Sequence, residues 1–379
     1  MFVAEAYRPE ALNHPTPASV LPASSDGVRA GRSTSLSRSF DTYAGYARAW
    51  RIIATRDDAP HHQWSDAADA EFGVARLSAE LAKEIKPGAL SPRTAESAYR
   101  SLSRAWSTES LLYALFKEST FGQSRWSGDL LRASVPWVAV QAYYSCFSAT
   151  QALVWVVQGR DLSGHSDVRR AFSEVWSPAL CDVKPYSASV AARPAADAKA
   201  FEFVGVPPAA DPTRTDPSSY WTRFEAWDVA ALSLRTTLEK HLSERYGDRR
   251  ARLKASRLPA VERERIRAKT HPVTMLDFLH RLRVTTNYKD ADVFLVGPRA
   301  GDDEPVRHFV SNLLQMTSAL LLATEMRIAS VSRDGEMTWW VDHWKRLHGW
   351  GESPLIYRQA EWCLLCADET HGDDSSGAP

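Results

Sequence analysis

The chain has 379 residues, and its 46 Lys and Arg side chains are balanced by 46 Asp and Glu side chains. This balance excludes a global electrostatic attraction to nucleic acid or anionic lipid, so any such binding must come from a local patch. Fourteen Trp argue against a largely disordered chain, and four scattered Cys argue against a disulfide scaffold. Because the N-terminus lacks a basic stretch followed by an apolar one, we expect a reducing, cytoplasmic setting.

The first part of the chain divides into an arm and a helical region. Residues 1–38 are rich in Ala, Pro, Ser and Gly and show no sustained periodicity, which predicts a flexible arm. Apolar residues recur at helical spacing from Phe40 onward, so residues 39–130 are expected to form an N-terminal helical region. Within it Ser91 and Pro92 predict a helix start, because Pro suits the first helical position.

Residues 133–159 contain no Asp, Glu, Lys or Arg and are long enough to span a membrane as a helix. Polar side chains interrupt this segment at Gln141, Tyr143, Tyr144, Ser145, Ser148, Thr150, Gln151 and Gln158. Lipid would leave these groups without hydrogen-bond partners, whereas neighbouring helices of a bundle can supply them. We therefore predict a buried helix and no membrane contact.

The second half begins with a Pro-rich insertion, residues 177–217, in which FEFVGV at 201–206 predicts one short strand. Helical patterns resume after it. Thr274 predicts one helix start, since an Asp follows three residues later, and Pro305 predicts another. Residues 331–379 are expected to form a Trp-rich segment and a flexible tail. Without a convincing sheet, the fold class is all-α, a helical bundle with an N-terminal helical extension.

Three separated segments carry a resemblance to a known family. Residues 140–172, VQAYYSCFSATQALVWVVQGRDLSGHSDVRRAF, contain a Tyr-Tyr-x-x-Phe helix, a short loop, His-Ser and a second helix. Residues 279–294, LHRLRVTTNYKDADVF, form an Arg-rich helix that ends in Tyr-Lys-Asp, and residues 305–326 would close the bundle. In this order the segments resemble HEPN domains. The resemblance covers residues 131–330 and implies a HEPN-like bundle that forms homodimers.

The catalytic branch of the HEPN family consists of metal-independent ribonucleases in which Arg is followed, four to six residues later, by His. A guanidinium holds phosphate, and an imidazole moves a proton near neutral pH. In this sequence the toxin-type pattern Arg-x4-His-x-Tyr falls on Arg281, Thr286 and Tyr288, so Thr stands where His is expected. The resemblance implies an RNA-cleaving toxin or antiviral-defence effector, as in toxin-antitoxin pairs. The alternative is a catalytically degenerate module that binds RNA or a partner protein.

The residues at the end of this helix are the candidate site. Arg281 or Arg283 would bind the phosphate, and Asn287, Tyr288 and Lys289 would line a polar groove. The alternative is that these cations only complement the dipole at a helix C-terminus. The Tyr of this family motif can accept a nucleotide, so the resemblance also implies a possible nucleotidyltransferase partner that modifies Tyr288.

A local basic patch precedes that helix. Between residues 240 and 270 there are eleven Lys or Arg and four acids, a difference of 11 − 4 = +7. Such a patch can neutralise several phosphates, although a solvated helix face gives the same pattern. The candidate nucleic-acid-binding residues are Arg249, Arg250, Arg252, Lys254 and Arg257.

Two other motifs are weaker. Arg160 and His165 match the Arg-x4-His spacing, but they straddle a loop, and we expect the His to cap a helix or to bond the backbone. Cys363, Cys366 and His371 form a partial zinc spacing that lacks a local fourth ligand. We therefore expect neither a metal nor a cofactor.

Overall fold

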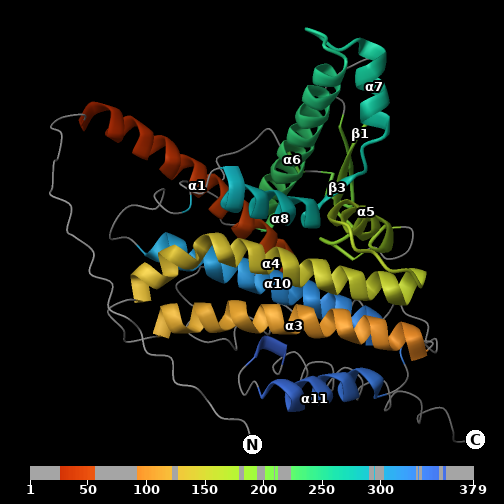
Figure 1. Cartoon of the computed structure of the whole chain (residues 1–379). Helices are drawn as coiled ribbons and strands as arrows, with labels where there is room; N and C mark the ends of the chain where they lie inside the picture. Colours follow the sequence, from red (N-terminus) through yellow and green to blue (C-terminus); the bar gives the residue numbers. More distant parts are fainter. Residues whose placement is uncertain are drawn as a thin grey trace, which may run out of the picture.

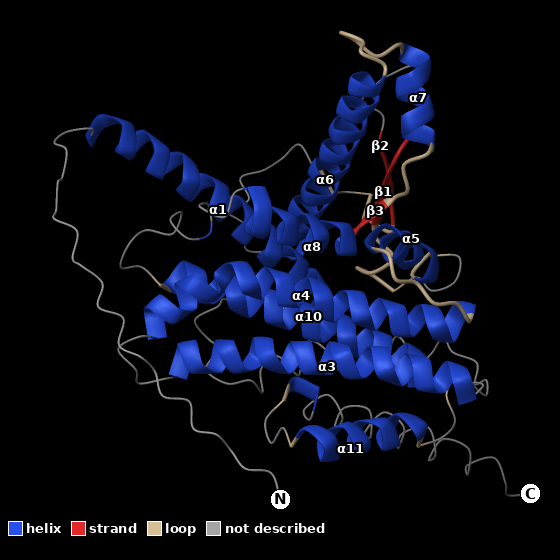
Figure 2. Ribbon diagram, viewed as in Figure 1, coloured by secondary structure: helices blue, strands red, loops and turns tan. Residues whose placement is uncertain are grey.

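Three long helices lie side by side and form the body of the protein (Figure 1): α3 (Pro92–Phe121), α4 (Ser127–Gln158) and α10 (Glu304–Ala329). This computed structural model describes residues 26–55, 92–121, 127–178, 183–193, 201–208, 210–211, 223–289, 294, 303–329, 332, 335–349 and 353–355. The all-α prediction is confirmed, because helices dominate the described residues (Figure 2). The helix starts predicted at Pro92 and near Pro305 are also confirmed.

The uncharged segment lies in α4, which packs against both α3 and α10. Its polar groups find partners inside the bundle: Ser145 donates to the Ala105 carbonyl of α3 at 2.9 Å, and the Gln151 amide donates to the Leu162 carbonyl. Among the described residues, no helix combines the length and the apolarity that crossing a membrane requires. The prediction of a buried helix is therefore confirmed.

Helix α1 (Asp26–Thr55) begins fourteen residues before Phe40, so residues 26–38 of the segment predicted to be flexible are helical. From Phe40 onward its side chains are mostly buried, and it packs against α10 and α6 (Arg223–Arg252). The indole of Trp50 donates to the Ser233 hydroxyl of α6 at 2.9 Å. The helix α11 (Glu336–His348) covers α3 on the opposite side of the body.

A small antiparallel sheet lies beside the body, in the order β2-β1-β3. Its strands are β1 (Ser189–Ala192), β2 (Phe201–Val204) and β3 (Val273–Thr274). Val190 of β1 lies opposite both Phe203 of β2 and Val273 of β3. The strand predicted at 201–206 is present over 201–204, but the sequence pattern did not predict the sheet. Strands of two to four residues are too short for their side-chain alternation to be recognised.

The helix α6 and the helix α7 (Ala260–Ala268) project from the body (Figure 1). We call these two helices and their connection the arm, and this name does not include the N-terminal segment. Two short helices, α5 (His165–Val175) and α8 (Met275–Val284), lie where this arm meets the body. The α8 helix continues as a π-helical turn, Thr285–Lys289. The arm and the body therefore meet at the segments that carry the candidate site.

Candidate functional site

Arg281 and Arg283 both belong to α8, yet they point to different surroundings. The Arg283 guanidinium lies over the rings of Tyr144 and Tyr143, 5.1 and 5.5 Å from the ring centres. The Arg281 guanidinium lies 6.0 Å from the ring centre of Tyr43, and its Nη1 is 3.4 Å from Thr237 Oγ1. Residues two apart on a helix face different sides, which accounts for these two different surroundings.

The remaining predicted residues lie in the π-helical turn. Thr286 is buried, and its hydroxyl donates to the Arg283 carbonyl at 3.0 Å. The hydroxyl proton is therefore engaged in a hydrogen bond with the backbone. Asn287 is half-buried. The side chains of Tyr288 and Lys289 lie outside the described part of the structure.

Two histidines that the sequence patterns did not place in the site, His165 and His280, lie near enough to Arg283 to feel its charge. The rings of His165 and His280 lie 5.8 Å apart between their centres, and each lies within 6 Å of the Tyr143 ring. The Tyr143 hydroxyl is 2.8 Å from His165 Nδ1, which fixes the orientation of that imidazole. We call Tyr143, His165, Arg169, His280 and Arg283 the His–Arg cluster. Its members come from α4, α5 and α8.

Asp277 pairs with Arg169 of this cluster and is fully buried. The Asp277 carboxylate accepts the Thr274 N–H at 2.9 Å, as the predicted helix start requires. It also pairs with Arg169 at 2.9 Å and with His271 Nε2 at 3.1 Å. Burial alone would raise the pKa of Asp277, but the hydrogen bond from His271 and the nearby positive charge outweigh burial and lower it to about 2. Asp277 is therefore an anion that holds Arg169 in place.

Both imidazoles of the cluster are neutral near pH 7. Burial and then the charge of Arg169 lower the pKa of His280 to about 3. Burial and the charges of Arg283 and Arg169 also lower the pKa of His165. Burial raises the pKa of Tyr143, so its phenol keeps its proton. The cluster thus offers proton acceptors beside fixed cations.

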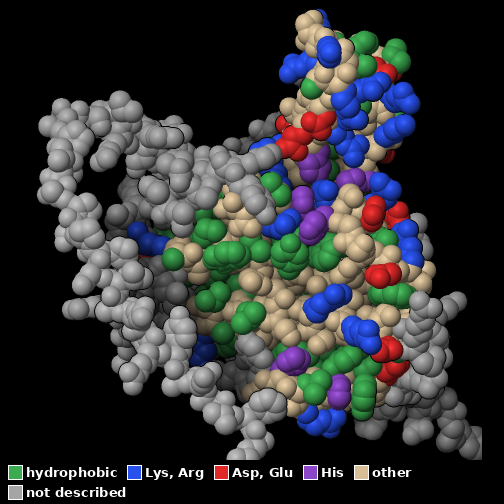
Figure 3. Space-filling model, viewed as in Figure 1, with side chains coloured by type: hydrophobic (Ala, Val, Ile, Leu, Met, Phe, Trp, Pro, Cys, Tyr) green, Lys and Arg blue, Asp and Glu red, His purple; other side chains and the backbone are tan. Residues whose placement is uncertain are grey.

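Arg283 brings a positive charge that no carboxylate within 4 Å neutralises among the described residues. Its Nε atom is buried and has no hydrogen-bond partner in that part of the chain. His and Lys or Arg side chains gather on the surface where the arm meets the body, as Figure 3 shows. A buried donor without a partner is costly, and an anion in the cluster would satisfy it.

The second match to the Arg-x4-His spacing is not one site. Arg160 is exposed and pairs with Glu174 at 2.8 Å. His165 is the first residue of α5, whose cap position is Gly164, and the His165 imidazole bonds Tyr143 instead of capping. A spacing search could not find the cluster, because its residues lie on three elements.

Two more predictions concern metal and phosphate. Cys363, Cys366 and His371 lie outside the described residues, and within these no group of three His, Cys, Asp or Glu side chains is arranged to hold a metal ion.

The candidate nucleic-acid-binding residues lie at the end of the arm. Arg249, Arg250 and Arg252 close α6, and Lys254 and Arg257 follow in the connection to α7.

Most of these arm cations are available to a ligand. Arg250, Arg252, Lys254 and Arg257 are exposed, and none has an ion pair among the described residues. Arg249 differs, since its Nε bonds the Glu262 carboxylate of α7 at 3.0 Å. Arg249 therefore joins the two helices of the arm.

We compared the chain with protein-family models, with curated proteins and with solved structures, and none of the three comparisons gave a significant match. The likeness to HEPN domains therefore rests on the order of the sequence segments. Any function must be argued from the geometry of the site.

Proposed function

We propose that the protein is a HEPN-like ribonuclease that cleaves RNA at the His–Arg cluster without a metal ion. One observation carries the proposal: the unneutralised Arg283 guanidinium lies beside two neutral imidazoles, those of His165 and His280. Cleavage of a phosphodiester requires a cation that holds the phosphate and groups that accept and donate protons.

The cluster also draws its members from the segments that resemble HEPN domains. Residues 140–172 supply Tyr143, His165 and Arg169, and residues 279–294 supply the other two members. This convergence supports the proposal. It assigns phosphate binding to Arg283, one of the two arginines predicted for that role, and proton transfer to the two histidines, since Thr286 stands where the family has His.

In the proposed reaction Arg283 holds the phosphate. One imidazole removes the proton of the ribose 2′-hydroxyl, and the 2′-oxygen attacks phosphorus. The bond between phosphorus and the 5′-oxygen breaks, and the second imidazole donates a proton to that oxygen. The products are a 2′,3′-cyclic phosphate and a 5′-hydroxyl. The bound phosphate favours the protonated form of the second imidazole, because a nearby anion raises the pKa of a histidine.

The second candidate is a degenerate module that binds RNA without cleaving it. The pKa of His280, about 3, favours this candidate, because a free cluster holds no protonated imidazole there near neutral pH. Binding needs only the cations of the cluster and of the arm.

The experiment compares Arg283→Gln with Arg281→Gln in the full chain. Both substitutions remove one guanidinium from α8, so the second is a matched control. Cleavage of a labelled single-stranded RNA is followed in EDTA, RNA binding is measured by fluorescence anisotropy, and folding is checked by thermal melting. We expect Arg283→Gln to lower the cleavage rate at least about 100-fold and Arg281→Gln to leave it within a few fold.

The outcomes separate the candidates. Loss of cleavage in Arg281→Gln alone would assign phosphate binding to Arg281, as the family motif implies. It would overturn the proposal that the His–Arg cluster is the cleavage site. Binding without cleavage by the wild type, weakened in Arg283→Gln, would establish the RNA-binding module. Absence of both binding and cleavage in the wild type would overturn both candidates.

A further inference from the structure

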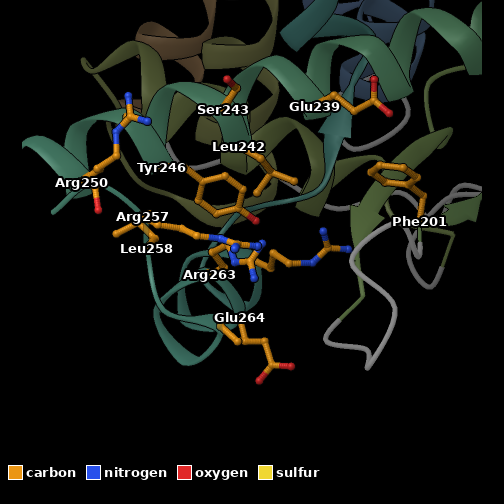
Figure 4. Close-up of a pocket in the computed structure, with 14 residues that line it drawn as sticks. Phe201, Glu239, Leu242, Ser243, Tyr246, Arg250, Arg257, Leu258, Arg263 and Glu264 are labelled. Carbon is orange, nitrogen blue, oxygen red and sulfur yellow. The ribbon is translucent and has the colours of Figure 1, made fainter.

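A basic hollow lies in the arm, between α6 and α7 (Figure 4). It has a volume of about 520 Å³, within the range of small-molecule sites. Leu242 and Leu258, both nearly fully buried, and the half-buried ring of Tyr246 contribute apolar surface to its lining. The lining thus includes an aromatic ring and apolar side chains that a flat group could contact.

Two arginines that lack a carboxylate partner in the described part of the chain line this hollow. The side chains of Arg257 and Arg263 come from different segments, both line the hollow, and both extend toward Tyr246 in the view of Figure 4. Neither has a carboxylate within 4 Å among the described residues, and the Arg263 Nε is buried without a hydrogen-bond partner. Two like charges in one hollow repel each other unless an anion joins them.

The acids that line the hollow do not supply that anion. Glu239 bonds Arg235 of its own helix at 3.0 Å, and the exposed Glu264 points away from the two guanidinium groups in Figure 4. Arg267, which also lines the hollow, is nearly fully buried and donates to the Arg193 carbonyl at 3.2 Å. The lining of the hollow therefore combines cationic side chains with apolar ones.

We propose that this hollow binds a nucleoside phosphate, with Arg257 and Arg263 holding the phosphate and Tyr246 packing against the base. Paired guanidinium groups match the oxygens of a phosphate, and an aromatic ring stacks on any base. A free nucleotide and the phosphorylated 5′ end of an RNA share this chemistry. The proposal does not depend on RNA cleavage at the His–Arg cluster.

The first test is calorimetric titration of the full chain with adenosine 5′-monophosphate, adenosine and inorganic phosphate. We expect the nucleotide to bind at least 10-fold more tightly than either of its parts. Arg257→Gln and Arg263→Gln should each weaken nucleotide binding at least 10-fold. Arg265→Gln is the control, because this α7 guanidinium is exposed and lies outside the hollow, 3.9 Å from Glu262.

The second test distinguishes the two sources of the nucleotide. An RNA with a 5′-phosphate is compared with the same RNA carrying a 5′-hydroxyl, with and without competing adenosine 5′-monophosphate. A preference for the 5′-phosphate that competition removes would assign the hollow to RNA ends, and nucleotide binding without that preference would assign it to free nucleotides.

The proposal is overturned if the wild type fails to bind the nucleotide at millimolar concentration, or if inorganic phosphate binds equally well. It is also overturned if Arg257→Gln binds like the wild type. Because Arg257 is exposed, this variant tests the site even if Arg263→Gln lowers stability.

Discussion

At the scale of single residues, Asp277 links three parts of the chain. Its carboxylate accepts the backbone N–H of Thr274 and pairs with Arg169 of α5 and His271 ahead of β3. A buried carboxylate is tolerated only when such partners replace its water. The position of Arg169 in the His–Arg cluster therefore depends on a residue that does not reach the surface.

We expect Asp277→Asn to lower the free energy of unfolding by about 3–5 kcal/mol, because it leaves Arg169 without its buried counter-charge. Urea denaturation measures the loss. The control is Glu174→Gln, which breaks an exposed pair with Arg160 and should cost less than about 1 kcal/mol. Equal losses in the two variants would show that burial does not strengthen the Asp277 contacts.

At the scale of elements, the arm formed by α6 and α7 divides its cations between two roles. Arg249 bonds Glu262 and joins the helices, whereas Arg250 and Arg252 are exposed at the end of α6. The helix α6 continues past Gly247 to Arg252, which extends the basic surface by more than a turn.

We expect the double substitution Arg250→Gln and Arg252→Gln to weaken RNA binding and to flatten its salt dependence. For single strands the slope of log K against log salt should fall by about 0.7 for each phosphate that the variant no longer neutralises. Anisotropy titrations at several salt concentrations measure the slope. Arg249→Gln is the comparison, and we expect it to change the slope less. An unchanged slope in the double variant would remove these two arginines from the RNA-binding surface.

At the scale of the whole molecule, the junction of the arm and the body contains two histidines that burial keeps neutral. Burial lowers the pKa of His280 in α8 to about 3 and that of His241 in α6 to about 4. The unfolded chain protonates these side chains near their ordinary pKa of about 6.5. Between the two pKa values the unfolded state therefore binds more protons than the folded state.

We expect the stability of the protein to fall as the pH drops from about 6.5 to about 4, because protons then favour the unfolded chain. Each histidine contributes at most about 1.4 kcal/mol per pH unit. Urea denaturation at several pH values measures the slope, and the double substitution His241→Asn and His280→Asn should flatten it. A slope that persists in this variant would assign the acid sensitivity to other groups.

The local features of this protein follow from its sequence alone. Capping residues specify the helix starts at Pro92 and Thr274. Residue pattern and polarity specify the buried character of residues 133–159 and the strand at 201–204. These signals lie within one turn or one strand, so neighbouring residues suffice to specify them. The balanced charge likewise excluded a global attraction to nucleic acid.

The meeting of distant residues, by contrast, depends on the packing of the elements. The contacts of α8 with α4 and α6 place Arg283 near His165 and Arg281 near Tyr43. The sequence of α8 alone does not show which of its two arginines lies near the histidines. The partners of Arg283 on α4 and α5 lie more than 100 residues away, and the relative rotation of these elements is set by side-chain packing. Local rules predict the helices, whereas the site depends on the way in which their faces fit together.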